Sequence, residues 1–370
     1  MTVLLWILGI LALPLVAFGV WWVAVFVKAF VKADPEAEEE AEKKEEAVRV
    51  LGLLPASAQN TSMARPVPAE WSAAQAAARQ GEWQPAAALL RSIGEDWNLR
   101  SGFVGVIGDV AVDDDTWLLA WENALPDDPD AAVVRAWSTV GLAGKVRGAK
   151  RAQHTSQEQF AGFHRTLARA REEIARAVEL NPADPTPFVS EISVALGLGY
   201  PNSEMNKLWE QIVLRAPHHY DAHYWALQYW CAKWRGSKKL AMDFAERAAR
   251  SAPLGSLLTV LPLVAHFEHD DSDSADVDRT PRMIARVDAA LADAAASDPA
   301  HPRLPAVRHV LAYFLALQDR HEAAIEQFTM VDGHIGALPW SYKGDPAHYY
   351  CHLRDISAAA VVAARNGTAA

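Results

Sequence analysis

The most informative stretch of this sequence is GSKKLAMDFAERAARSAP, residues 236–253. Its alanines Ala241, Ala245 and Ala248 follow at intervals of four and three residues, which is the spacing of one face of an α-helix. Gly236 and Pro253 stand at the two ends, and both residue types interrupt helices. Alanines on a helix face let a neighbouring helix approach closely. The stretch therefore predicts a short helix that packs tightly against another helix.

The same pattern extends over most of the chain, from about Ala69 onward. Helical runs of ten to sixteen residues alternate with breaks rich in Pro, Gly, Asn and Asp. Strand-like alternation is scarce, and its one weak candidate is residues 102–112. The breaks at Pro182, Pro217 and Pro253 are 35 and 36 residues apart, and Pro299 follows after 46. A period of about 34 residues is typical of stacked helical hairpins, so we predict an all-α fold.

Several stretches resemble the repeats of the tetratricopeptide repeat family. Residues 80–83, QGEW, with Ala86 and Leu90 after them, resemble the turn between the two helices of such a repeat and its second helix. Residues 318–321, QDRH, begin a similar frame, and residues 170–182 and 236–253 resemble second helices with their terminal proline. The resemblance implies an α-solenoid of helical hairpins over residues 69–370, irregular over residues 94–160 and carrying an acidic insert at residues 270–280.

The resemblance also implies a concave surface that binds a partner protein or peptide. In its frame, five residues lie on this surface and are expected to contact the partner: His223, Trp230, Lys233, His309 and Tyr313. A large aromatic side chain beside cationic donors is typical of residues that anchor a bound peptide.

Aromatic residues crowd the helix predicted at residues 220–235. One apolar stripe of this helix would form a complete buried face, and it consists of Tyr220, Tyr224, Leu227, Cys231 and Trp234. Trp225 and Tyr229 lie outside that stripe. We interpret them as a second packing face, because a helix inside a solenoid has neighbours on both sides.

The composition indicates a folded body and excludes several classes of protein. The chain has 370 residues, of which 51% are apolar and 22% charged, enough for a hydrophobic core. Its 46 acidic and 35 basic residues give a net charge of −11, which argues against general binding of nucleic acids. Only two cysteines, Cys231 and Cys351, exclude a disulfide framework and a four-cysteine zinc site.

The N-terminal sequence predicts a membrane anchor. Residues 3–27 are uncharged and mostly apolar, long enough as a helix to cross a bilayer, so we assign residues 1–32 to a single transmembrane helix. Lysines follow this span, and the positive-inside rule then predicts a cell-membrane protein with its C-terminal domain in the cytoplasm. A cleaved signal peptide is disfavoured, because no Lys or Arg precedes the run. Residues 33–68 are predicted to form an acidic helical stalk and a flexible linker.

The chemical motifs in the sequence are incomplete. Gly102, Gly105 and Gly108 lack the spacing of a dinucleotide-binding loop. The pairs His219/His223 and His348/His352 have the one-turn spacing of shared metal ligands, but no further ligand completes either site. The aspartates of residues 270–280 lack the spacing of a calcium loop, so we predict a solvated insert. We therefore predict no metal site, no cofactor and no enzymatic activity.

Basic residues gather between residues 135 and 176, where nine Lys or Arg stand against three Glu. A patch of this kind suits anionic lipid headgroups, an acidic partner or the acidic stalk of the same chain. A solvated helix face explains the charges equally well.

These features predict a membrane-anchored, tetratricopeptide-like scaffold that binds a partner protein along its concave face. Two alternatives stay open. One is an enzyme or metal-dependent regulator with its site in residues 94–160 or in the C-terminal helix. The other is a structural spacer within a membrane complex.

Overall fold

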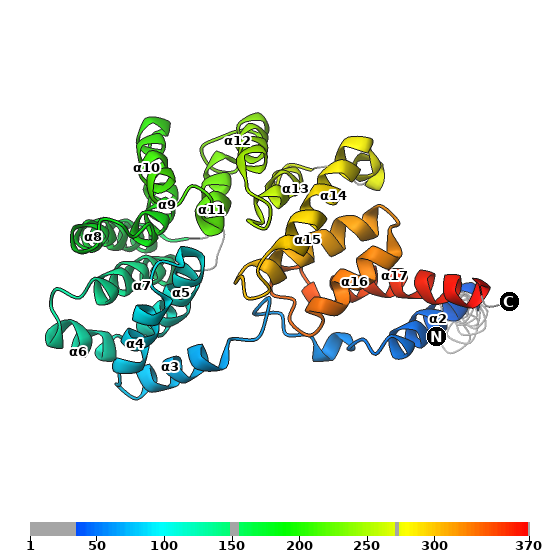
Figure 1. Ribbon diagram of the computed structural model, residues 1–370, viewed down its shortest axis with the longest axis horizontal. Coiled ribbons are helices and arrows are strands. Elements are labelled where there is room, and N and C mark those ends of the chain that lie inside the picture. The colour runs from blue at the N-terminus through cyan, green and yellow to red at the C-terminus, as the bar shows by residue number, and fades with distance from the viewer. Residues whose placement is uncertain (1–34, 149–154, 271–273, 369–370) are drawn as a thin grey trace, which may run out of the picture. The chain divides into compact units, whose positions relative to one another are not determined.

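The computed structural model describes residues 35–148, 155–270 and 274–368, and over these residues the protein is all-α, as predicted (Figure 1). The described residues form sixteen α-helices and no β-strand. The helices are α2 (Pro35–Val50), α3 (Ala69–Arg79), α4 (Gln84–Ile93), α5 (Trp97–Asp113), α6 (Thr116–Ala124), α7 (Pro129–Arg147), α8 (Gln157–Leu180), α9 (Thr186–Leu198), α10 (Asn202–Arg215), α11 (Tyr220–Trp230), α12 (Lys238–Ser251), α13 (Leu261–Phe267), α14 (Pro281–Ala296), α15 (Leu304–Leu317), α16 (His321–Val331) and α17 (Pro346–Thr368). Short 3-10 helices are η1 (Ala56–Ala58), η3 (Leu258–Val260), η4 (Ala275–Arg279) and η5 (Trp340–Tyr342).

The helix ends follow the residues that predicted them. Helices α8, α10 and α12 end two residues before Pro182, Pro217 and Pro253, and α14 ends three residues before Pro299. Proline lacks an N–H group and disfavours helical geometry in the residue before it. At the start of α8, the Ser156 hydroxyl accepts a hydrogen bond from the backbone N–H three residues on, and that residue's side chain accepts one in return.

Residues 94–160 differ from expectation. The weak strand candidate at residues 102–112 is wrong, because these residues lie within α5. Their valines and glycines look strand-like in sequence, but α5 is packed on several sides, and a helix in that position is apolar nearly all round. The stretch expected to be irregular contains the three complete helices α5, α6 and α7.

The chain divides into two compact units, residues 1–53 with 358–370, and residues 54–357. In the first unit, α2 carries the stalk sequence, and its Lys43 and Lys44 pair with Glu39 and Glu40 one turn earlier, at 2.6 Å each. The predicted membrane helix, residues 1–32, lies outside the described residues. Within the described residues, no helix combines the length and apolar character needed to cross a membrane.

The start of the second unit, part of the predicted flexible linker, is held by specific hydrogen bonds. The Asp332 carboxylate accepts from the backbone N–H of Leu54 at 2.6 Å and from Gln59 Nε2 at 2.8 Å. Arg354, which is buried, donates to Leu54 O at 2.7 Å and to Asp332 at 2.8 Å. Asn60 also pairs with His334 as a parallel β-bridge. These bonds fasten residues 54–60 to the segment after α16 and to α17.

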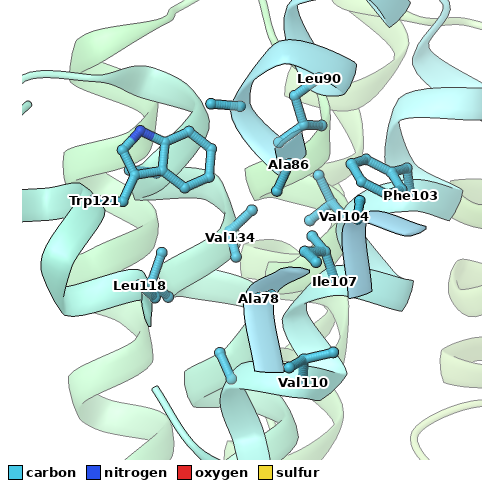
Figure 2. Packing of buried hydrophobic residues seen from close by; sticks show 14 of the residues in the cluster. Ala78, Ala86, Leu90, Phe103, Val104, Ile107, Val110, Leu118, Trp121 and Val134 are labelled. Carbon is cyan, nitrogen blue, oxygen red and sulfur yellow. The ribbon is translucent and has the colours of Figure 1, made fainter. Parts of the chain in front are cut away.

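Small and large apolar side chains from the helices α3, α4, α5, α6 and α7 form one core. Ala78, Ala86, Leu90, Ile107 and Val134 converge there from four different helices (Figure 2). Because alanine extends only one carbon beyond the backbone, the helices that carry it approach closely, and larger side chains fill the remaining space.

A buried arginine ties this core to the helices that follow. Arg100 on α5 donates from Nη2 to Asp130, in the first turn of α7, at 2.6 Å. It also donates from Nε to Asp184, just before α9, at 2.8 Å. Removal of one partner from a buried ion pair commonly costs about 3–5 kcal/mol, because the other charge is left uncompensated. Arg100 therefore fixes the positions of α7 and α9 relative to α5.

The glycines of α5 let two tryptophan rings lie against its backbone. A Cβ atom on Gly102 would approach the Trp71 ring at 3.2 Å, and one on Gly105 would approach the Trp137 ring at 3.2 Å. A Cβ on Gly108 would lie 2.5 Å from Trp137 Cδ1, closer than side-chain carbons normally come. The three glycines at intervals of three residues matched no nucleotide-binding motif. Their role is to let the tryptophan rings pack against α5.

We expect Gly108→Ala to lower the free energy of unfolding by about 1–3 kcal/mol, because the added methyl group displaces Trp137. This loss outweighs the gain of about 1 kcal/mol that alanine normally brings within a helix. Urea denaturation of the full chain measures the change.

Gly144→Ala is the matched control. Gly144 is exposed on α7, and apart from the neighbouring backbone of that helix nothing lies within 4 Å of the position of its added Cβ. This substitution should raise the free energy of unfolding by up to about 1 kcal/mol. A change of the same sign in both variants would contradict the packing role of Gly108.

Candidate functional site

Two of the five expected partner contacts, His223 and His309, are buried. His223 is 4% exposed, and its ring packs edge-on against Trp209 with 4.8 Å between centroids. His309 is 0% exposed, and it accepts from Trp340 Nε1 at 3.0 Å while its Nε2 donates to His334 O at 2.9 Å. Neither histidine lies on a surface as predicted. Burial lowers the pKa of each to about 4, so both rings are neutral at pH 7.

The histidine pair His219/His223 is used for local structure. The Nδ1 atom of His219 accepts from the backbone N–H of Ala222 and caps the start of α11, and its Nε2 donates to Trp97 O at 3.1 Å. His223 Nδ1 donates to the backbone oxygen of His219 at 3.0 Å. Both ring nitrogens of His219 therefore have hydrogen-bond partners within the protein.

The other three expected contacts lie in different surroundings. Trp230 is half-buried and lines a pocket of about 430 Å³ together with His223. The exposed Lys233 forms an ion pair with Glu268 at 2.7 Å and donates to the Tyr342 hydroxyl at 2.9 Å. Tyr313 is half-buried and packs against the aromatic rings of Phe267 and Trp340. His223 and Trp230 thus line one pocket, whereas Lys233 and Tyr313 lie beside a different set of residues that includes Phe267 and Tyr342.

Helix α11 ends at Trp230, five residues before the predicted end. The chain then turns sharply, and the backbone N–H of Ser237 donates to Trp230 O at 3.0 Å. A Cβ on Gly236 would lie 1.8 Å from Trp230 O, so only glycine permits this turn. Tyr229 is buried as predicted and donates to Tyr200 O at 2.6 Å. Trp225, expected to be packed, is 36% exposed.

The exposed face of Trp225 belongs to the most promising binding site, which we call the groove. It consists of two adjoining pockets of about 460 and 260 Å³ that share Ala64, Arg303, Ala306 and Gly336. Aromatic side chains from α3, α7 and α11 contribute to its lining: Trp71, Trp137, Tyr220, Tyr224 and Trp225. The glycine face of α5, with Gly102 and Gly105, also lines the larger pocket.

Arg303 stands where the two pockets meet, and it is held in place by Asp221. Its Nε and Nη2 donate to the two carboxylate oxygens of Asp221 at 2.6 and 2.8 Å, a bidentate arrangement. Burial would raise the pKa of Asp221, but the attraction of Arg303 prevails and lowers it. The pair is therefore charged, and it fixes the loop before α15 against α11.

Arg65 lies in the larger pocket and is unlike the other arginines described above. Its guanidinium lies over the Trp71 ring at 5.4 Å from the centroid. Within the described part of the chain, it forms no ion pair and no hydrogen bond. Burial, followed by repulsion from Arg303, lowers its pKa, which reflects a half-buried cation without a compensating anion. The donors of Arg65 are thus available to a ligand.

The basic stretch at residues 135–176 shows the contrasting arrangement. Five of its described basic residues form ion pairs with acids: Arg135 with Asp115 and Glu122, Lys145 with Asp113, Arg169 with Glu173, Arg171 with Glu204, and Arg176 with Asp127. Lys150 and Arg151 lie outside the described residues. A pocket of about 420 Å³ beside Arg135 is therefore lined by arginines whose charge is already compensated.

Comparison with known proteins gave no match to a family model, a curated protein or a solved structure. The groove is thus interpreted from its own geometry.

Few features of the sequence indicated the residues of the groove. Arg65 lies in the proline-containing segment expected to be a linker, and Trp71 looks like an ordinary core residue. Asp221 and Arg303 are 82 positions apart, so their pairing depends on the fold. The aromatic excess on α11 was the one usable signal, because it included Trp225.

The buried histidines predict a loss of stability in acid. The folded pKa of His309 is about 4 and its ordinary value is 6.5, so the unfolded chain binds the proton more readily between these values. Stability therefore falls as the pH drops from about 6.5 to 4, by up to about 3 kcal/mol for one such histidine. His309→Gln should show a smaller fall than the parent protein in denaturant titrations at pH 7 and pH 4.

His348→Gln provides the comparison, because His348 is exposed on α17. This variant should keep the pH dependence of the parent protein. An unchanged dependence in His309→Gln would show that His309 is not buried in its neutral form.

Proposed function

We propose that this protein is an α-solenoid scaffold that binds a partner protein through the groove, with Arg65 contacting a carboxylate of the partner. The single observation that carries the proposal is the uncompensated guanidinium of Arg65 in an aromatic-lined groove. Free carboxylates of an extended peptide suit such a site, because arginine binds them through paired hydrogen bonds. Aromatic walls supply apolar contact area for the rest of the peptide.

The packing of the helices supports the solenoid part of the proposal. Successive helices pack as neighbours, for example α3 with α4, α7 with α8, α11 with α12 and α15 with α16. Every second helix also packs against the next one in that series: α3 with α5, α5 with α7, α7 with α9, α9 with α11 and α11 with α13. Stacked hairpins produce this pattern, because the first helix of each hairpin contacts the first helix of the next.

The groove is lined by that series of first helices. Residues of α3, α5, α7, α11 and α13 contribute to its lining, and the rest comes from α15 and from the segments at residues 62–68, 302–303 and 336–341. The concave face of a hairpin stack is formed by these same helices. These helices support a partner surface on the face implied by the tetratricopeptide resemblance, formed by other residues than the five expected ones.

Membrane attachment is a further part of the proposal. The apolar run at residues 3–27 and the lysines that follow it favour a single anchor with the body in the cytoplasm. Attached in this way, the protein would present the groove to partners near the membrane surface.

Selection from a displayed library of random peptides on the full chain tests the proposed function. We expect bound peptides to be enriched in Asp and Glu. Arg65→Ala should weaken their binding about tenfold or more, because a hydrogen bond to a charged group contributes about 1.5–3 kcal/mol. Arg65→Glu should abolish binding of acidic peptides.

Arg91→Ala is the matched control, since Arg91 is exposed on α4 and does not line the groove. It should bind the selected peptides as the parent protein does. Peptides without acidic residues, or equal binding to the parent protein and Arg65→Glu, would refute the groove as the binding site.

A further inference from the structure

Three ligand-type side chains converge between α13 and η4. His266 lies near the end of α13, Asp270 follows this helix, and Asp278 belongs to η4. His266 Nε2 is 3.0 Å from Asp278 Oδ1 and 3.8 Å from Asp270 Oδ2. One ligand atom of each side chain lies within 4.8 Å of the others. The sequence predicted a solvated acidic insert here, whereas the fold brings two of its carboxylates to one imidazole.

The environment of Asp278 argues against a solvated carboxylate. Its side chain is 5% exposed, and among the described residues its carboxylate has no Lys or Arg partner. Its sole partner there is His266. The neighbouring Arg279 is directed elsewhere, with Nε donating to Leu317 O at 2.8 Å and Nη2 pairing with Asp319 at 2.8 Å. A buried carboxylate without a fixed cation is unfavourable unless a cation joins it.

The three side chains are also positioned by a rigid neighbour, helix α15 and its end. The backbone oxygen of Asp278 accepts from Gln318 Nε2 at 2.8 Å. The His266 ring packs against Phe314 with 6.0 Å between ring centroids. Burial raises the pKa of the Tyr313 hydroxyl, its interaction and hydrogen bond with Tyr349 raise it next, and the charges of Asp278 and Asp270 raise it further. The three side chains are thus held in place, and the site carries negative charge, before any ligand binds.

We propose that His266, Asp270 and Asp278 bind a divalent transition-metal ion of the zinc and manganese class. Metal–ligand distances of about 2.0–2.2 Å place adjacent ligand atoms about 3.0–3.5 Å apart. The distance between His266 Nε2 and Asp278 Oδ1 already lies in this range. A small rotation of the Asp270 side chain, which is 25% exposed, would bring its carboxylate into the same range from His266. Imidazole nitrogen with carboxylate oxygen selects this class over calcium, which prefers oxygen ligands alone. Water molecules would complete the coordination.

The ion would link α13 to η4 and so to α15. This role is independent of the groove, because none of the three ligands lines it. Metal binding and peptide binding are therefore separable in experiment.

The full-length protein, stripped with a chelator and dialysed, is titrated with Zn²⁺ and, in parallel, with Co²⁺, whose visible absorption reports coordination. We expect saturation at about one ion per chain. Asp278→Asn and His266→Gln should each lower the affinity by about 100-fold or more, and Asp270→Asn by about tenfold or more. Because Asp278 is buried, circular dichroism verifies that Asp278→Asn still folds. If this variant unfolds, the metal affinities of the His266 and Asp270 variants test the proposal, because those side chains are more exposed.

His348→Ala/His352→Ala is the control, because these exposed histidines form the other one-turn pair in the described chain. It should retain the parent affinity. Absence of saturable binding would overturn the proposal and leave His266 and Asp278 as a simple hydrogen-bonded pair. Loss of binding in the control but not in the His266 and Asp270 variants would overturn it equally.

Discussion

Close approach of helices at alanine and glycine positions is the constraint on which the rest of this structure depends. Ala86, Ala136, Ala195, Ala241 and Ala324 are completely buried although they lie on separate helices. At these points the backbones come near enough for the larger side chains to interlock around them. The glycines of α5 extend the same principle, because they let tryptophan rings rest on the helix itself. The rings then form part of the groove wall, so the packing rule also shapes the candidate site.

The arginines of this protein differ in whether a carboxylate neutralises their charge. Those with a carboxylate partner stabilise the fold, and one without such a partner can bind a ligand. Arg100 and Arg354 are buried, and each has carboxylate partners that fasten separate parts of the second unit. Arg303 is held by Asp221, and the basic residues near Arg135 are mostly paired. Arg65 breaks this pattern. A half-buried guanidinium stacked on tryptophan, with its donors free, is better suited to recognition than to stability, since its charge is costly until an anion arrives.

Much of the helical structure was predictable, but the candidate site was not. The prolines after α8, α10 and α12, and the alanine spacing of residues 236–253, are local signals that hold in the structure. The strand suggested at residues 102–112 is wrong because a helix enclosed by others is apolar nearly all round, and short apolar runs do not distinguish a strand from such a helix. His223 and His309 were placed on a surface by analogy with a repeat frame. Their burial follows from Trp209 and Trp340, which that frame does not include.

Local sequence was sufficient to specify that this chain is helical and where many of its helices end, because spacing, capping residues and prolines act within a few residues of one another. Local sequence did not indicate which partners the charged and polar groups have. Arg303 with Asp221, Arg354 with Leu54, and Arg100 with Asp184 join positions far apart in the chain. Whether an arginine is neutralised, a histidine buried or three ligands gathered depends on which helices meet, and that is a property of the packed molecule.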